Sequence, residues 1–245
     1  MTRAPRRLRI GILRADSVLP ALSPTFGQYP EMFSRLLVEA DPALDFAEWD
    51  VENDGVPSNP GECDGWLITG SRRSAYDDLP WIGRLGGFVR EVVEARQPLF
   101  AVCFGHQLVA HVLGGRTEKS PAGWTVGTQR HAIDRPFPWV HDGPREVRLL
   151  HSHQDQVVRL PAGAERVGGS EACPLGFYRI DDHVMSCQGH PEFSTDYARA
   201  LYTERRGAIG EEAWRRAQDS LIEPNDRLEV ARWASAFFRR DTRRE

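Results

Sequence analysis

Short apolar runs alternate with longer amphipathic segments through the first half of the chain. The strand-like runs span residues 8–13, 45–51, 65–69 and 98–102, and the segments with helical spacing span 29–39, 81–95 and 106–113. Strands that alternate with helices of this length are typical of βαβ units, whose mostly parallel sheet is covered by helices on both faces. The pattern therefore predicts an α/β sandwich with its site at the carboxyl ends of the strands.

The pattern changes after Gly114 and Gly115. Short strand-like runs separated by Gly, Pro and Asp turns follow, and they predict antiparallel additions to the sheet. These runs span 116–134, 145–150, 156–160, 165–169, 176–180 and 184–188. From 194 to 240 helical spacing returns, with apolar stripes that include Trp233, Phe237 and Phe238. Burial statistics favour the core over a ligand site for such stripes.

Length and composition are those of one large domain. The chain has 245 residues, 40% of them hydrophobic, which is enough to bury a substantial core. We expect a single domain over residues 1–245, with a core at about 8–206 and a helical extension at 207–245. No apolar stretch is long enough to span a bilayer, and residues 8–13 are too short for a secretory signal, so no membrane association is expected.

Charge and cysteine usage narrow the function classes. A net charge of −4 argues against nucleic-acid binding, because no excess of Lys and Arg is present to neutralise phosphates. Basic clusters at residues 3–9 and 239–244 are explained more simply as frayed, solvated termini. The four cysteines are widely spaced and contain no C-x-x-C pair, which favours free thiols in a reducing compartment and predicts a cytoplasmic location.

Cys103 stands where an apolar strand stops and an amphipathic helix begins. Such a sharp turn exposes a nucleophile, and the unpaired N–H groups at a helix start favour the thiolate. Gly105 permits the tight turn, so that the amide of Phe104 provides one half of an oxyanion hole. The Gly70-Ser71 turn, at the end of the preceding strand, is the candidate for the other half. The alternative is that Cys103 is a small buried hydrophobe, as most free cysteines are.

His190 is the candidate base. It follows an apolar strand and precedes Pro191, which restrains the backbone, and Glu192 lies two residues further on, where a carboxylate can orient the imidazole. Taken alone, a histidine before a proline is more simply a solvated turn residue. The combination with Cys103 instead indicates Cys-His-Glu acyl-transfer chemistry.

Together, these motifs resemble the class I glutamine amidotransferase superfamily. The family's Gly-x-Cys-x-Gly-x-Gln motif appears at residues 101–107, with Ala101 in place of the first glycine, and its His-Pro-Glu element is intact at residues 190–192. The resemblance spans roughly residues 8–206. It implies a flavodoxin-like sandwich in which Cys103 attacks a γ-glutamyl carbonyl to form a thioester, while His190 relays the proton and Glu192 orients His190.

The resemblance also implies roles for further residues. Gln107 stands where the family places a glutamine near the substrate's side-chain amide, and the amides of Phe104 and of Gly70 or Ser71 match its oxyanion donors. The segment 151–155 resembles the family's Ser-His-x-Asp element, which lies beside the α-amino and α-carboxylate groups of the substrate. The matching residues are Ser152, His153 and Asp155.

Segments at 68–71, 75–78, 80–82, 103–106 and 123–127 look most like stand-alone members, including the γ-glutamyl peptidase group. No Gly-x-x-x-x-Gly-Lys loop is present and too few residues follow Glu192 for an ATP-dependent domain, so no cofactor is expected. The leaving group stays open. Ammonia would make the protein a glutaminase, with a separate synthetase or amine-using protein as partner, whereas an amine or dipeptide would make it a γ-glutamyl peptidase. Arg72, Arg73 and Tyr76 either select a charged tail or are solvated.

Two other functions compete with this hypothesis. The spacing His151-x-His153-x-Asp155 is compatible with zinc, although a third histidine at suitable spacing is missing, so no metal site is expected. A non-catalytic partner subunit that keeps the fold is the second alternative, motivated by Ala101 and by the aromatic residues of the helical tail. The intact Cys-His-Glu set argues against it.

Overall fold

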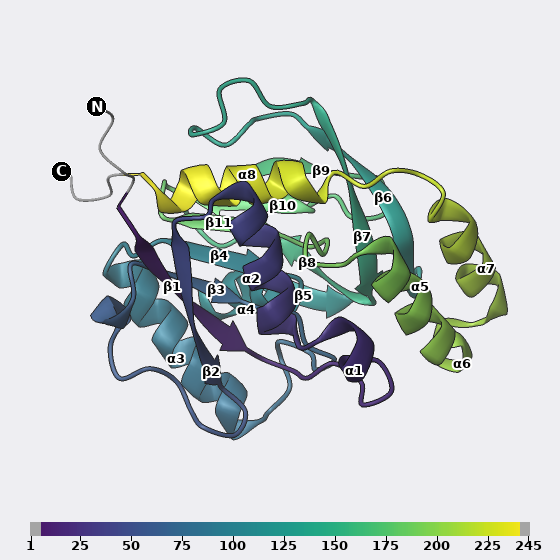
Figure 1. The fold of residues 1–245 in the computed structure, drawn as a ribbon, viewed down its shortest axis with the longest axis horizontal. Coiled ribbons are helices and arrows are strands. Elements are labelled where there is room, and N and C mark those ends of the chain that lie inside the picture. Colours follow the sequence, from purple (N-terminus) through teal and green to yellow (C-terminus); the bar gives the residue numbers. More distant parts are fainter. Residues whose placement is uncertain (1–5, 241–245) are drawn as a thin grey trace.

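The main sheet is built from strands throughout the chain. The structure is a computed structural model that describes residues 6–240, and within them nine strands form this sheet. The strands are β1 (Leu8–Arg14), β2 (Leu44–Asp50), β3 (Gly65–Ile68), β4 (Leu99–Val102), β6 (Thr125–Ile133), β7 (Glu146–His153), β9 (Ala164–Gly169), β10 (Phe177–Ile180) and β11 (Val184–Cys187). Their order is β2-β1-β3-β4-β11-β10-β9-β6-β7 (Figure 1).

The sheet changes from parallel to antiparallel at β11. β1 pairs in parallel with β2 and β3, β3 with β4, and β4 with β11. From β11 onward every pairing in the sheet, through β10, β9, β6 and β7, is antiparallel. The predicted fold class, a mostly parallel sheet with antiparallel additions, is confirmed. One strand is corrected: the run at 184–188, predicted among the antiparallel additions, forms β11, which pairs in parallel with β4 and belongs to the parallel part.

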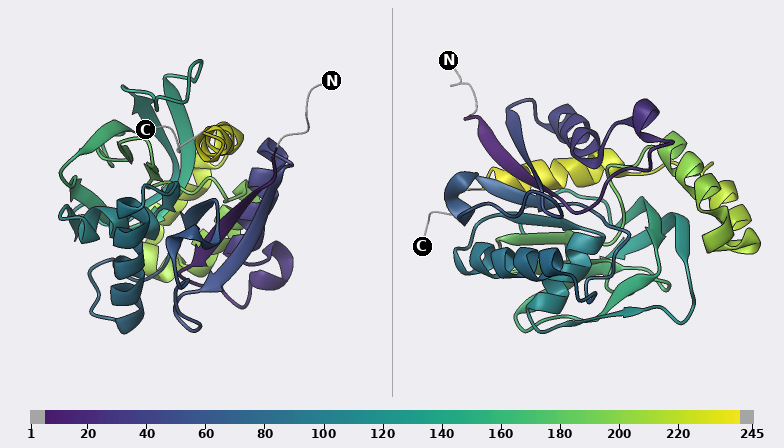
Figure 2. Two further views of the ribbon diagram at one scale, coloured as in Figure 1. Left: turned by 90° about the vertical axis from the view of Figure 1, so that its left-hand side faces the viewer. Right: turned by 90° about the horizontal axis from the view of Figure 1, so that it is seen from below.

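Helices cover both faces of the parallel part. α2 (Tyr29–Ala40) and α8 (Arg227–Phe238) lie on one face, and α3 (Pro80–Glu94) and α4 (Phe104–Val112) on the other (Figure 2). Successive residues of β4 therefore enter different clusters: Phe100 packs toward α2 and α8, whereas Leu99 and Ala101 pack toward α3 and α4. Because both faces are covered, β3 and β4 are buried at every position, which explains their unbroken apolar sequence.

The predicted strand 116–134 is wrong in extent, because the structure divides it into two. β5 (Arg116–Lys119) ends before Pro121 and pairs with β8 (Asp155–Arg159) in a separate two-stranded sheet. β6 begins after Gly123, whose φ of 82° allows the chain to change direction. The remaining helices are α1 (Ser23–Phe26), α5 (Thr195–Glu204), α6 (Arg206–Ile209) and α7 (Glu211–Ser220).

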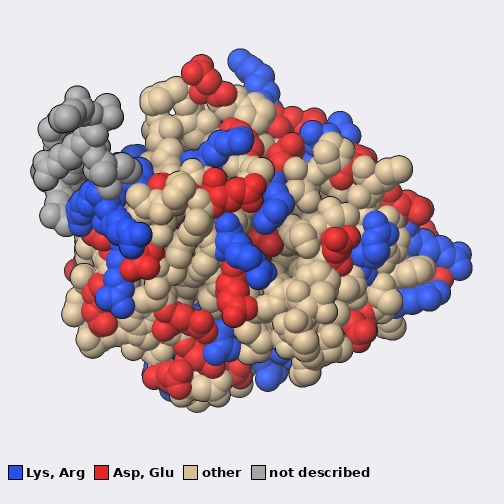
Figure 3. Space-filling view, in the orientation of Figure 1, with Lys and Arg blue, Asp and Glu red and all other residues tan. Residues whose placement is uncertain are grey.

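Aromatic residues of the last helix lie in the core, as expected. Trp233, Phe237 and Phe238 on α8 are at most 3% exposed and pack with β1 and α2. On the surface shown in Figure 3, Lys and Arg are interspersed with Asp and Glu and form no large basic patch. Among the helices described between residues 6 and 240, none combines the length and apolar character that crossing a bilayer requires.

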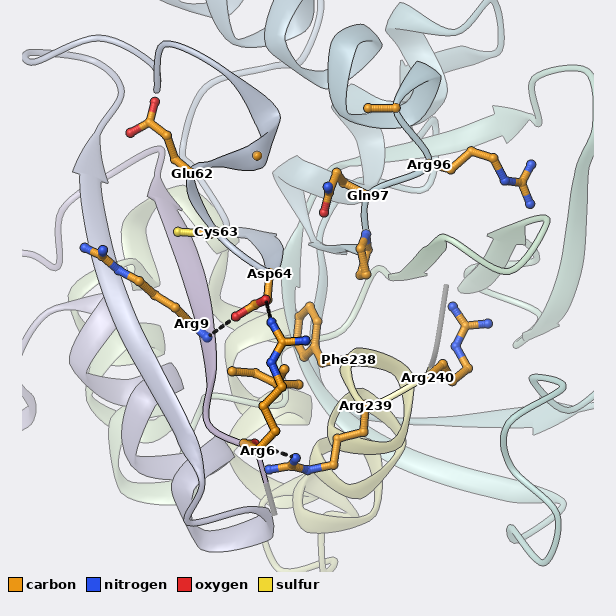
Figure 4. Close-up of a pocket in the computed structure, with 14 residues that line it drawn as sticks. Arg6, Arg9, Glu62, Cys63, Asp64, Arg96, Gln97, Phe238, Arg239 and Arg240 are labelled. Carbon is orange, nitrogen blue, oxygen red and sulfur yellow. Dashed lines mark hydrogen bonds and ion pairs between the residues drawn. The ribbon is translucent and has the colours of Figure 1, made fainter. Parts of the chain in front are cut away.

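A polar cavity of about 670 Å³ lies beside the amino ends of the central strands, between the start of β1 and the end of α8 (Figure 4). The basic residues here are not simply solvated, because ion pairs engage several of them: Arg6 pairs with Asp64, and Arg239 with Asp41. Arg239 also donates to the carbonyl of Arg6 at 2.9 Å. The ion pairs and the hydrogen bond beside this polar cavity thus link the start of the first strand to the end of the last helix. The expected frayed ends at 3–5 and 241–244 lie outside the described residues.

The pair between Arg239 and Asp41 is the stabilising contact with the clearest expected effect. Asp41 is 8% exposed, and its carboxylate also accepts a hydrogen bond from Ser235 on α8. We expect Arg239→Ala to lower the free energy of unfolding by about 1–2 kcal/mol, because it leaves Asp41 partly buried without its counter-charge. Urea unfolding at pH 7 measures the effect.

The pH dependence and a matched variant distinguish the stabilising effect of the Arg239–Asp41 pair from the effect of removing any surface arginine. Burial tends to raise the pKa of Asp41, but the hydrogen bond from Arg239 and others lower it on balance. The contribution of the pair is therefore present at neutral pH and is lost as pH falls through the lowered pKa, so wild type and variant converge in acid. Arg232→Ala, on α8 and 64% exposed, should change stability by less than about 0.5 kcal/mol. Equal losses in both variants would contradict the prediction.

Candidate active site

Three strand ends meet at one edge of the parallel sheet. Thr69 and Gly70 follow β3, Cys103 follows β4, and His190 follows β11 after two residues. The three strands are neighbours in the sheet, so residues far apart in sequence are brought together at their carboxyl ends. This is the edge at which the sequence predicts the site.

Cys103 occupies a strained turn between β4 and α4. Its φ of 51° and ψ of −101° lie in a region that non-glycine residues rarely adopt, at a cost of about 1–3 kcal/mol. The turn is held from both sides, because the Cys103 amide donates to the carbonyl of Cys187 and its carbonyl accepts from the amide of Gln107. Gly105 is required here: a Cβ at this position would lie 2.8 Å from the carbonyl oxygen of Ile68.

His190 and Glu192 form a buried ion pair. Nδ1 of His190 lies 2.7 Å from Oε1 of Glu192, and the two residues are 5% and 2% exposed. Phe193 stacks on the imidazole with ring centroids 3.9 Å apart and planes inclined by 8°. Burial alone would lower the pKa of His190, but the charges of Glu192 and Cys103 outweigh it and raise the pKa to about 10. The imidazolium is therefore favoured at neutral pH, and its ring is fixed in orientation.

Gly70 lies between the cysteine and the histidine. A Cβ on Gly70 would be 2.8 Å from Cε1 of His190 and 3.6 Å from Cβ of Cys103. The two side chains therefore flank the same glycine. In the described residues the amides of Phe104, Gly70 and Ser71 have no backbone or side-chain acceptor, whereas that of Arg72 donates to Asp16. All three expected oxyanion donors are thus free.

Gly70→Ala tests how closely this site is packed. The added methyl group must displace the imidazole, and misplacement of a reacting group by about 1 Å can cost about 10²-fold in rate. We expect a fall in kcat of about 10- to 100-fold for any reaction that uses His190. Gly83→Ala on α3 is the matched control, because a Cβ there meets nothing within 4 Å. Unchanged activity in Gly70→Ala would show that His190 lies elsewhere in solution.

The predicted substrate-binding residues line one cavity with the cysteine. This cavity, of about 720 Å³, is bordered by Cys103, Gln107, Ser152, His153 and Asp155. Gln107 donates from Nε2 to the backbone carbonyl of Asp155 at 2.7 Å, so the helix that carries Cys103 is tied to this segment. The structure therefore brings all four expected binding residues to the nucleophile.

Arg72, Arg73 and Tyr76, which the sequence indicates as candidates for selecting a charged tail, also border this cavity, whereas sequence reasoning missed Ser74, Lys119 and Arg205. Ser74 and Tyr76 donate hydrogen bonds to the carboxylate of Asp155, and Arg205 donates to Oγ of Ser152 at 3.1 Å. Lys119 and Trp124 also border it. Arg205 stands in the helical segment after the His-Pro-Glu element, where no local pattern distinguishes it from other surface arginines.

The alternative of a zinc site finds no support in the geometry. Between residues 6 and 240 no group of three or more His, Cys, Asp and Glu side chains is arranged to hold a metal ion. The ring nitrogens of His151 and His153 are instead hydrogen bonded to each other at 3.0 Å.

Comparisons with known proteins agree with the geometry. The family model for class-I glutamine amidotransferases matches residues 25–206. A glutamine amidotransferase-like protein of Schizosaccharomyces pombe is 30% identical over 81% of this chain and 84% of its own. γ-Glutamyl peptidase 4 of Arabidopsis thaliana is 27% identical over 70% of each chain. A glutamine-hydrolysing GMP synthase subunit of Archaeoglobus fulgidus is 28% identical over 72% of this chain and 91% of its own.

A solved structure shows the same fold. The crystal structure of a glutamine amidotransferase from Thermotoga maritima superposes with a TM-score of 0.74 over 96% of this chain and 97% of its own, at 17% identity. The matched segment 25–206 contains Cys103, His190 and Glu192. With a family match over most of its length and a relative at 30% identity, the chain belongs to the class-I glutamine amidotransferase family.

Proposed function

We propose that this protein hydrolyses γ-glutamyl amide bonds through a thioester on Cys103. The observation that carries the proposal is the meeting of a strained cysteine, a buried His190–Glu192 pair and free backbone amides around Gly70. Each of these features is costly for a fold to maintain, and together they provide a nucleophile, a proton carrier and oxyanion donors.

The reaction proceeds in two halves. The Cys103 thiolate attacks the δ-carbonyl carbon, and the oxyanion is bound by the amides of Phe104 and the Gly70-Ser71 turn. The C–N bond breaks as the imidazolium of His190 gives its proton to the leaving amine. Neutral His190 then takes a proton from water, which attacks the thioester carbonyl; the C–S bond breaks, glutamate leaves, and the Cys103 thiolate and the His190 imidazolium are restored. Glu192 stabilises the imidazolium throughout.

The cavity beside Cys103 supports a substrate larger than glutamine. Its volume of about 720 Å³ exceeds the space that a glutamyl group fills, and cationic side chains of Arg73, Lys119 and Arg205 border it. We therefore propose a γ-glutamyl peptide with a free carboxylate as the preferred substrate. Similarity to the γ-glutamyl peptidase of Arabidopsis thaliana supports the same choice.

A second candidate is glutamine hydrolysis that supplies ammonia to a separate synthetase. The similarity to the GMP synthase subunit of Archaeoglobus fulgidus, most of whose length is matched, favours it. In this case the mouth of the same cavity would face the partner protein. A cytoplasmic location is part of either proposal and is supported by the four cysteines, which are all free thiols.

Substrate hydrolysis by the isolated protein decides between these candidates. Glutamine, a γ-glutamyl dipeptide and a γ-glutamyl alkylamide of similar size are compared for release of glutamate. The proposal expects the dipeptide to have the highest kcat/KM, by about tenfold over the uncharged alkylamide, since one ion pair in a partly desolvated site contributes about 1–2 kcal/mol. Glutamine as the best substrate would favour the ammonia-supplying role. Inactivity on all three, with no adduct from a glutamine-analogue electrophile, would favour the non-catalytic alternative.

A further inference from the structure

Three histidines form one continuous hydrogen-bonded chain next to the active site. Nε2 of His131 on β6 lies 2.8 Å from Nε2 of His151 on β7, and Nδ1 of His151 lies 3.0 Å from Nε2 of His153. Nδ1 of His153 lies 2.9 Å from the backbone carbonyl oxygen of Asp155. We call His131, His151 and His153 the histidine chain.

The final contact fixes the direction of every hydrogen bond in the histidine chain. A carbonyl oxygen only accepts, so Nδ1 of His153 carries the proton and, in a neutral ring, its Nε2 accepts. His151 must then donate from Nδ1 and accept at Nε2, and His131 must donate from Nε2. Nδ1 of His131 is left as a bare acceptor, and within residues 6–240 it has no partner. Leaving a buried acceptor unpaired at the end of the histidine chain costs less free energy than leaving a buried N–H donor unpaired.

Burial keeps the three rings neutral. His131 and His151 are fully buried and His153 is 4% exposed. Desolvation lowers the pKa of His131 to about 4 and that of His153 to about 3, and it lowers the pKa of His151 in the same direction. Three buried polar rings are costly for a β-sheet to maintain, and apolar side chains would fill the same space without hydrogen bonds. We therefore look for a function that offsets this cost at the point where the histidine chain ends.

The histidine chain ends at the backbone of the cavity wall. The carbonyl of Asp155 accepts from His153 and also from Nε2 of Gln107. The carboxylate of Asp155 is held separately, by the hydroxyls of Ser74 and Tyr76. Both ring nitrogens of His153 are thus already engaged, and neither is free to bind a substrate group.

We propose that His131 and His151 are positioning residues that, through His153, fix the Asp155 segment for binding of the glutamyl end of the substrate. The inference rests on the proposed function, since the Asp155 carboxylate is the group that receives the α-ammonium. In this proposal His153 holds the backbone carbonyl of Asp155 in place, and the side chains of Asp155 and Ser152 contact the substrate. His131 lies outside the cavity lining and acts only through the other two rings.

Nitrogen NMR of the histidine-labelled full-length protein tests the histidine chain directly. We expect three neutral rings at pH 7, with the proton on Nε2 of His131 and on Nδ1 of His151 and His153. Single His→Gln variants assign the signals. A cationic ring among the three, or His153 protonated at Nε2 alone, would overturn the assigned direction. This measurement needs no substrate.

Steady-state kinetics on the best γ-glutamyl substrate tests the positioning role. We expect His131→Leu to raise KM about tenfold, at the lower end of what loss of an outer orienting partner costs, with kcat changed little. His131→Gln should restore KM, because its Nε2 amide can donate to His151 in place of the ring. His141→Gln, on the exposed surface, is the matched control.

The two readouts separate the possible failures. Equal losses in His131→Leu and His131→Gln, or a fall in kcat alone, would overturn the positioning role even if the protein hydrolyses γ-glutamyl bonds. If the wild type hydrolyses no γ-glutamyl substrate, the proposed function fails, and with it the role of the histidine chain in substrate binding. The tautomers observed by NMR still decide the direction of the hydrogen bonds in the histidine chain. If His131→Leu does not fold, the comparison of His131→Gln with wild type, by KM and by the protonation of His151, carries the test.

Discussion

Replacing Cys103 with alanine is expected to abolish γ-glutamyl hydrolysis, with a loss of about 10³-fold or more in kcat. The three atoms nearest to a Cβ placed on Gly70 belong to His190 and Cys103, so the cysteine is the nucleophile beside the proposed base. Alanine keeps the Cβ and the backbone of the turn, and the variant should therefore fold as the wild type does. Release of glutamate from the best substrate measures the loss, and circular dichroism checks the fold.

The other thiols provide the controls for this experiment. Burial raises the pKa of Cys63 to about 11 and that of Cys173 to about 12, and it raises the pKa of Cys187 in the same direction. These thiols stay protonated and unreactive. A glutamine-analogue electrophile should therefore modify Cys103 alone, as read by mass spectrometry of peptides. Cys63→Ala, far from the site, should keep full activity, and an active Cys103→Ala variant would rule out the thioester mechanism.

Local signals in the sequence were sufficient for the parallel half of the fold. β3 and β4 read as unbroken apolar runs because helices cover both of their faces, and the turn at Cys103 is marked by the change from such a run to helical spacing. His190 and Glu192 were identified by a short motif in which they are two residues apart. Their contact is local in sequence, so the pattern could reveal it.

The rest of the site depends on long-range pairing, which leaves no local pattern. Ser74 and Tyr76 reach Asp155 only because the loop after β3 folds over the cavity. His131 lies opposite Val147 and His151 opposite Gly127 in the antiparallel pair of β6 and β7, so the contact between the two rings depends on a register that the sequence does not show. In the sequence the spacing of His151, His153 and Asp155 is compatible with zinc, although no metal site is expected, and nothing in it indicates a hydrogen-bonded chain that includes His131.

The ion pair between His190 and Glu192 determines how the site responds to pH. In the folded protein the pKa of His190 is raised to about 10, whereas the unfolded value is near 6.5. A raised pKa means that the pair contributes stability fully below about pH 6.5, and that this contribution is lost as pH rises through about 10. The alkaline limit of activity should follow the same ionisation, because His190 must carry the proton that the leaving amine receives.

Glu192→Gln keeps the size of the side chain and removes its charge. Burial still lowers the pKa of His190 in this variant, while the largest charge that raises it is lost, so the alkaline limb of kcat/KM should move to lower pH by about 1–3 units. At neutral pH we expect activity to fall by about 10²- to 10⁴-fold, because the imidazolium loses both its counter-charge and its orienting acceptor. Glu212→Gln on α7, where the side chain is 88% exposed, should leave the profile unchanged. A pH profile of Glu192→Gln that superposes on that of the wild type would mean that the carboxylate only fills space, because a charge acting through His190 must shift its ionisation.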